Sequence, residues 1–116
     1  MNPRVLFVIT TDPRTSPRPA EAARIAAGLS AWKTVAVTVY LRDAAVLALS
    51  EFPDELTDGH HFSRYLPLLA ESGGLVCAER DAPLLGQIGQ AQFPFRKIGD
   101  DEFAALLANN DYLIRL

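Results

Sequence analysis

Three short runs of almost uninterrupted apolar residues constrain the fold of this chain most. The runs occupy residues 5–9, 35–41 and 74–77. A strand that is buried on one face alternates apolar and polar residues, whereas a strand covered on both faces is apolar throughout. The first two runs are also rich in β-branched and aromatic residues, which favour strands. We therefore expect a sheet with both faces covered by helices.

Segments with helical periodicity separate these runs. Residues 20–32 place their apolar side chains on one helical face, and Ser16 is expected to cap this helix. The next such segment runs from Phe62 to a stop at Gly73, and Pro67 is expected to bend it or to delay its start. Shorter helices are expected at residues 44–49, after a cap at Asp81 and after a cap at Asp100.

Two further strand signals complete the pattern. Residues 93–98 indicate a short strand, and Pro94 places it at an edge of the sheet because proline cannot donate to a ladder. Residues 112–114 form the last expected strand. Alternation of strands and helices is typical of a parallel sheet between two helix layers. We predict a flavodoxin-like α/β fold: a single domain over residues 1–116, built as a three-layer sandwich around a mostly parallel five-stranded sheet.

Composition narrows the classes of function. The formal net charge is −3 and the 11 basic residues form no run, so we expect no nucleic-acid partner. Hydrophobic residues make up 49% of the 116 residues, and this surplus favours a homo-oligomer. The apolar stretch near the amino terminus is too short for a signal-peptide core or a membrane span. We therefore expect a cytoplasmic protein with no membrane partner.

The sequence contains no recognisable motif for a nucleotide or a metal. Residues 10–16 follow the first expected strand and lack the glycines that let a backbone wrap a pyrophosphate. His60 and His61 are adjacent, and Cys77 has no second cysteine with which to form a zinc-type spacing. We expect no cofactor and no metal.

Cys77 is the only cysteine, and it lies where the third apolar run is expected to give way to a loop. In open α/β sheets, ligands and reacting groups gather beyond the carboxyl ends of the strands, so a lone thiol there is a candidate for sulfur chemistry. A free cysteine is also among the most buried residue types and often serves as a small apolar side chain. Both interpretations stay open at this point.

Four cationic side chains are candidates to activate this thiol, because the loops that follow the first three strands share one edge of the predicted sheet. The candidates are Arg42, Arg80, Arg14 and His61. A nearby positive charge lowers the pKa of a thiol, whereas the carboxylates of Glu79 and Asp81 would raise it. The long loop that ends at His61 is expected to fold over this edge as a lid.

Several segments together resemble the DsrE/DsrF-like family. The likeness covers nearly the whole chain and is carried by residues 5–11, 37–44, 65–77, 103–107 and 112–114. It implies a small α/β protein that assembles as a trimer or hexamer, and some members carry sulfur as a cysteine persulfide. Cys77 matches the cysteine that holds this sulfur. Sulfur-relay members have a basic pair before a glycine, where this chain has Leu84 and Leu85 before Gly86.

Two functional hypotheses follow, and the sequence favours the first over the alternative. In the first, the protein is a sulfur carrier with sulfurtransferase-like activity: Cys77 takes sulfur from a donor protein as a persulfide and passes it to an acceptor protein. Arg42 and Arg80 would stabilise the anion, and the loop around His61 would shield it. In the second, the protein is a non-catalytic DsrE-like subunit that forms oligomers or binds a small ligand. Cys77 is then a packing residue.

Overall fold

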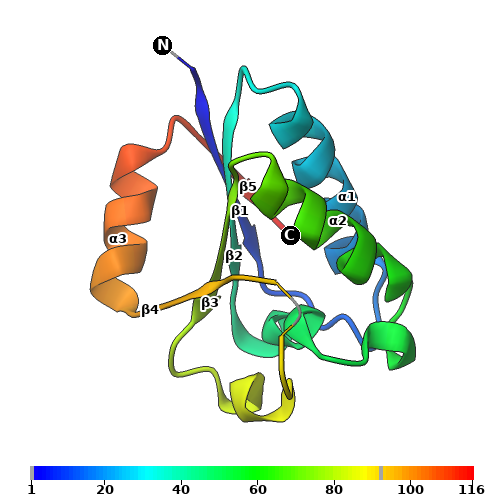
Figure 1. Ribbon diagram of the computed structural model, residues 1–116. Helices are drawn as coiled ribbons and strands as arrows, with labels where there is room; N and C mark the ends of the chain where they lie inside the picture. Colours follow the sequence, from blue (N-terminus) through cyan, green and yellow to red (C-terminus); the bar gives the residue numbers. More distant parts are fainter. Residues whose placement is uncertain (1, 92) are drawn as a thin grey trace.

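The structure is a computed structural model, and it describes residues 2–91 and 93–116 of the chain (Figure 1). The strands are β1 (Arg4–Ile9), β2 (Ala36–Leu41), β3 (Leu75–Glu79), β4 (Arg96–Ile98) and β5 (Tyr112–Arg115). The α-helices are α1 (Arg18–Ala31), α2 (His60–Glu71) and α3 (Asp100–Asn109). Three short 3-10 helices are η1 (Asp43–Leu49), η2 (Pro53–Glu55) and η3 (Pro83–Gln87).

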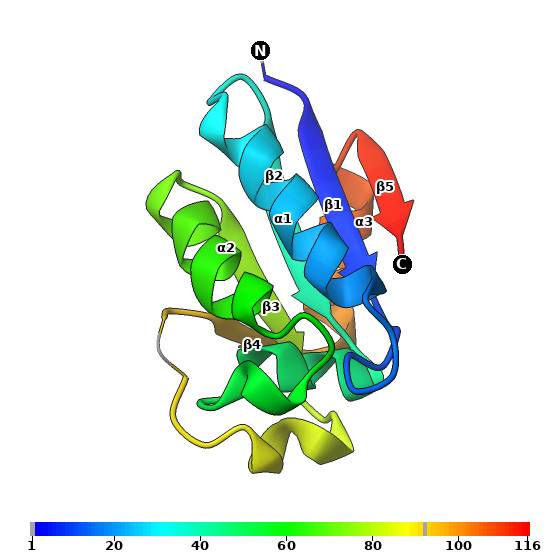
Figure 2. The ribbon, with the colours of Figure 1, turned by 90° about the vertical axis from the view of Figure 1, so that its right-hand side faces the viewer.

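The strands form one sheet in the order β4-β3-β2-β1-β5, and every pair of neighbours is parallel. Helices α1 and α2 lie side by side on one face, and α3 lies on the other (Figures 1 and 2). The predicted three-layer α/β fold is confirmed, including the position of residues 96–98 in an edge strand. Within the described residues the sheet is wholly parallel, where the sequence predicted a mostly parallel one.

The two faces of the sheet are covered unequally. Alternate residues of β1 point to opposite faces: Val5, Phe7 and Ile9 join the large core beneath α1 and α2, whereas Leu6 and Val8 join a small cluster beneath α3. No residue of α3 is buried, and this helix packs on the small cluster through two partly buried residues. Most of the buried apolar surface therefore lies on the side of α1 and α2.

Two amino-terminal caps differ from the predictions, because the residue after the predicted one occupies the cap position. The amino-terminal cap of α1 is Pro17 rather than Ser16, although the Arg18 N–H still donates to Ser16 Oγ at 3.2 Å. The segment after Asp81 is the 3-10 helix η3, and Ala82 is its cap. Asp81 caps no helix, so that prediction was wrong.

The starts of α2 and α3 also differ from the predictions. Helix α3 begins at Asp100 itself, with Gly99 as its cap, and the Glu102 carboxylate accepts the Gly99 N–H at 3.4 Å. Helix α2 already begins at His60, so Pro67 lies inside the helix and does not delay its start. In the part of the chain that the structure describes, no helix is long and apolar enough to span a membrane.

The position of the large core predicts how two leucine substitutions in α2 change the free energy of unfolding. Leu66 is buried and Leu68, two positions later, is about half exposed. We expect Leu66→Ala to lower the free energy of unfolding by about 2–5 kcal/mol, because it leaves a cavity in the large core. Leu68→Ala is the matched control, with an expected change within about 0.5 kcal/mol. Denaturant unfolding measures both, and equal losses would contradict the assignment of the core.

Candidate functional site

Cys77 lies in the middle of β3, not at its end. It is the third of the five residues of this strand and pairs with Tyr40 of β2 and Arg96 of β4. The strand continues because Ala78 is apolar and buried and because Glu79 still pairs with Ile98 of β4. The predicted position of Cys77 at the mouth of a loop was therefore wrong, and its side chain belongs to a face of the sheet.

The Cys77 side chain faces α3 and is only 3% exposed. Its cluster contains Leu6, Val8, Tyr40 and Ile98, and Phe103 and Leu106 of α3 pack against it. A groove of about 240 Å³ between the sheet and α3 reaches this residue. Its lining includes Leu75, Cys77, Arg96, Ile98, Glu102 and Leu106. The thiol thus lies in the wall of a largely apolar groove.

Burial determines the protonation of this thiol. Loss of hydration raises the pKa of Cys77, and two weaker effects oppose one another: the Arg96 guanidinium lowers this pKa and the Glu102 carboxylate raises it. The outcome is a pKa above the usual value of a thiol. The thiolate is the reactive form of a cysteine, so a raised pKa favours the less reactive, protonated thiol.

Arg42 and Arg80, the two cations expected to stabilise a thiolate, are paired with carboxylates. Arg42 Nε lies 3.4 Å from Glu79 Oε2, and the Arg42 guanidinium lies over the Phe103 ring, 5.4 Å from its centroid. Arg80 Nη2 lies 3.0 Å from Glu102 Oε1. These pairs connect the carboxyl ends of β2 and β3 to each other and to α3, and each carboxylate balances the charge of its guanidinium.

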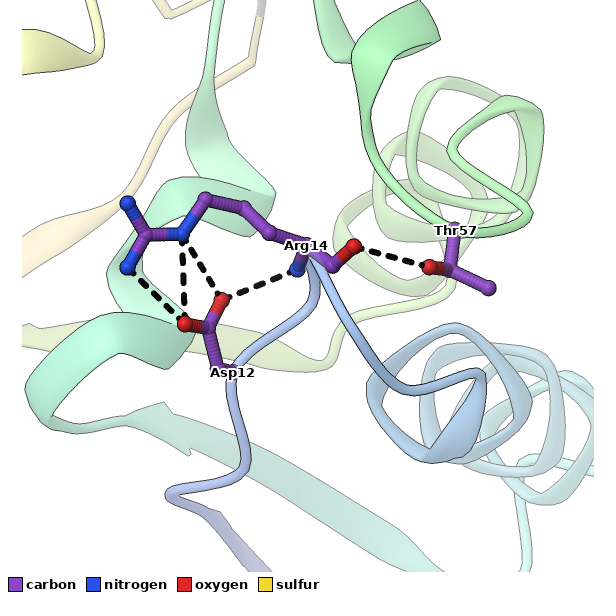
Figure 3. A network of polar contacts seen from close by, with 3 residues as sticks. All are labelled: Asp12, Arg14 and Thr57. Carbon is purple, nitrogen blue, oxygen red and sulfur yellow. Dashed lines mark hydrogen bonds and ion pairs between the residues drawn. The ribbon is translucent and has the colours of Figure 1, made fainter.

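Arg14 is held by its own loop. Its Nη2 lies 2.8 Å from Asp12 Oδ2, its Nε contacts both oxygens of that carboxylate, and its backbone N–H donates to Asp12 Oδ1 (Figure 3). Thr57 Oγ1 donates to the Arg14 carbonyl at 3.2 Å. The ion pair lowers the pKa of Asp12 and raises that of Arg14. Arg14 therefore brings no unbalanced positive charge to the edge of the sheet.

His61 does not occupy the predicted position beside Cys77. It belongs to the first turn of α2, on the sheet face opposite to Cys77, and its ring packs edge-on against His60 and Tyr65. The loop that precedes it folds in part as η2 and joins the loop after β1, where the Thr57 N–H donates to the Pro13 carbonyl at 2.8 Å. The structure therefore does not bring the four predicted cations together around the thiol.

The charged residues that do act on Cys77 are Arg96 and Glu102, and sequence reasoning missed both. Arg96 reaches the thiol because β4 pairs with β3 in the register that places it beside Cys77. Glu102 reaches it because α3 crosses this face of the sheet. Arg96 is a charged residue within the short strand predicted at residues 93–98, and this feature could have identified it from the sequence. Among the described residues, no cluster of three or more His, Cys, Asp or Glu side chains could hold a metal ion.

Comparisons with known proteins support the fold. No family model matches the chain, and no curated protein matches its sequence. Among solved structures, the crystal structure of the ychN protein from E. coli is similar, with a TM-score of 0.78, 18% sequence identity and coverage of 100% of both chains. This likeness supports the predicted single-domain α/β fold over the whole chain. At this identity the likeness concerns the fold alone.

The burial of Cys77 predicts its reactivity. We expect a maleimide or iodoacetamide to modify the native protein slowly, with a rate that rises only above pH about 8.5, the ordinary pKa of a cysteine. The chain unfolded in urea should react at the normal rate. Arg96→Gln should raise the apparent pKa further, because it removes the cation that lowers it. Fast modification of the native protein at pH 7 would contradict this description.

Proposed function

We propose that this chain is a non-catalytic, self-associating subunit with a DsrE-like fold, in which Cys77 is a packing residue. The observation that carries the proposal is the position of the thiol in the middle of β3, buried beneath α3. A sulfur carrier needs a thiolate that a donor and an acceptor can both approach. Cys77 instead has a raised pKa and belongs to a buried cluster on which Phe103 and Leu106 pack.

The sequence beyond β3 supports this proposal. Leu84 and Leu85 belong to η3, where the sulfur-relay members that the chain resembles have a basic pair. The nearest basic residue after β3, Arg80, is paired with Glu102. The positive charges that would hold a persulfide anion are thus replaced by leucines or balanced by a carboxylate.

Self-association is supported by the apolar surface of β5 and α3. Strand β5 is an edge strand that pairs with β1, and all four of its residues are exposed. Its exposed residues include Tyr112, Leu113 and Ile114, and Leu107 is exposed on α3. An apolar edge strand is a template for pairing with another chain, and monomers seldom leave one open. We propose that further copies of this chain cover this surface, in a trimer or hexamer.

A sulfur carrier is the second candidate function, because the groove beside Arg96 reaches Cys77. In that reaction the Cys77 thiolate attacks the outer sulfur of a donor persulfide, the donor leaves as a thiolate, and Cys77 holds the new S–S bond. An acceptor thiolate or another nucleophile on an acceptor protein then takes the outer sulfur and returns the Cys77 thiolate. Opening of the contact between α3 and the sheet would have to precede the attack.

Intact mass spectrometry separates the two candidates. The native protein is incubated with a persulfide donor, beside a Cys77→Ser variant and a sample unfolded in urea. Under the proposed function, the unfolded wild type gains one sulfur and the native wild type does not, because the fold withholds the thiol. A one-sulfur gain of the native wild type that disappears in Cys77→Ser would overturn the non-catalytic assignment.

The exposed apolar strand predicts an assembly that a single charge disrupts. Leu113 of β5 is 46% exposed, and Leu68 of α2 is 45% exposed on the opposite side of the sheet. We expect Leu113→Lys to shift the protein towards the monomer, because burying an unpaired charge in the interface is unfavourable. Leu68→Lys should leave the oligomer unchanged. Light scattering after size exclusion measures the mass, and a monomeric wild type at micromolar concentration would contradict the proposal.

A further inference from the structure

The two edges of the sheet differ in how well they are protected. Strand β4 is only three residues long, and its Arg96 and Lys97 are exposed; a short, charged strand discourages pairing at an edge. Strand β5, at the opposite edge, has four exposed residues, including the apolar Tyr112, Leu113 and Ile114. Figure 2 shows β5 at the margin of the sheet, to the right of β1 and α1. Strand β5 is therefore the edge that is suited to pairing with another strand.

The hydrogen bonds of β5 fix which of its backbone groups point outward. In a parallel ladder, every second residue directs both its N–H and its C=O to the same neighbouring strand. Leu116 does so towards the end of β1: its N–H donates to the Val8 carbonyl at 2.9 Å, and its carbonyl accepts the Thr10 N–H at 3.3 Å. The alternate residues Leu113 and Arg115 therefore turn their N–H and C=O groups to the open edge.

This alternation restricts how a second copy of β5 can pair with the first. Two copies related by a two-fold axis run antiparallel along a shared edge, and residues with outward backbone groups have to face one another. The register with Leu113 opposite Leu113 of the second copy meets this requirement. It also places Arg115 opposite Asp111 and Tyr112 opposite Ile114. A shift of two residues in either direction would shorten the overlap of the two strands.

The charges of this segment are complementary to those of its own reversed copy. The segment consists of Asp111, three apolar residues and Arg115, so antiparallel pairing places an acidic residue opposite a basic one at both ends. Opposite charges that face each other across two strands are stabilising, whereas like charges are destabilising. Asp111 Oδ2 accepts the Arg4 N–H at 2.8 Å, which holds this exposed carboxylate at the start of β5. Within the described residues, the Arg115 side chain has no carboxylate partner.

The apolar positions of β5 also match on both faces of the sheet. Ile114 is in register with Phe7 of β1, whose side chain lies beneath α1 and α2, and Leu113 is in register with Leu6, beneath α3. In the paired strands, Tyr112 faces Ile114 of the second copy on the first face, and the two Leu113 side chains face each other on the second. Aromatic and β-branched residues are favourable neighbours across antiparallel strands. Pairing thus covers apolar surface on both faces.

We propose that β5 pairs with β5 of a second copy around a two-fold axis, so that one sheet continues through both chains. The two Leu113 residues lie at the axis, and Asp111 of each copy forms an ion pair with Arg115 of the other. The proposal rests on the self-association proposed above and specifies its geometry. Of the two assemblies proposed there, a hexamer made of two trimers contains two-fold axes, and a trimer alone does not.

Reversal of the two charges tests the register. Arg115→Asp and Asp111→Arg each place like charges opposite one another, and each should weaken the two-fold contact at least about tenfold, a change of about 1.4 kcal/mol. Light scattering over a dilution series should then show half the wild-type mass. An equimolar mixture of the two variants should recover the full mass, because each copy meets opposite charges on the other. Lys97→Asp, in the opposite edge strand, is the matched control and should leave the mass unchanged.

Cross-linking tests the position of the axis. In a Cys77→Ala background, Leu113→Cys supplies the only thiol, and the Cα atoms of the two copies would lie about 5.5 Å apart, within reach of a disulfide. Tyr112→Cys is the control, because its two Cα atoms would lie about 8 Å apart, too far for a disulfide. Mild oxidation should link the Leu113→Cys chains into a dimer on a denaturing gel and leave the Tyr112→Cys chains unlinked.

The outcomes separate this geometry from the self-association on which it rests. A wild type that is monomeric at micromolar concentration would overturn both. A wild-type oligomer whose mass is unchanged in Arg115→Asp and Asp111→Arg would overturn the pairing of β5 and leave self-association through another surface. Failure of the mixture to recover the mass, or cross-linking of Tyr112→Cys in place of Leu113→Cys, would contradict the register.

Discussion

Coverage of both faces of a parallel sheet is the constraint on which the rest of this structure depends. The strands β1, β2 and β3 carry apolar side chains on both faces, and each face has to be shielded from water. Helices α1 and α2 shield one face and produce the large core. On the other face, the described residues supply α3, which has no buried residue of its own. Leu113 of β5 pairs with Leu6 on this thinly covered face, and it remains exposed together with Leu107 of α3.

The same constraint determines what Cys77 can do. Because side chains alternate along a strand, the register of β3 sends Cys77 to the thinly covered face, beside Tyr40 and Arg96. Burial there raises the pKa of the thiol, and one guanidinium does not reverse the effect of desolvation. Under the proposed function, Cys77 is therefore a packing residue of the cluster beneath α3.

The carboxyl edge of the sheet is organised by ion pairs within the chain. Arg42 contacts Glu79, Arg80 contacts Glu102 and Arg14 contacts Asp12, so each of these guanidinium groups has a carboxylate partner. Exposed pairs of this kind contribute little stability, but they orient the loops and balance local charge.

The sequence by itself determined the layers: uninterrupted apolar runs separated by helical periodicity are consistent with a parallel sheet between helices, and Pro94 was enough to predict an edge strand. Local patterns carry that information because burial on one or two faces imposes a repeat on neighbouring residues. Only the tertiary structure decided the surroundings of Cys77 and the partners of the arginines. These surroundings and partners depend on strand register and on the path of α3. Both bring together residues that are distant in the sequence, such as Cys77, Arg96 and Glu102, and no local pattern predicts such contacts.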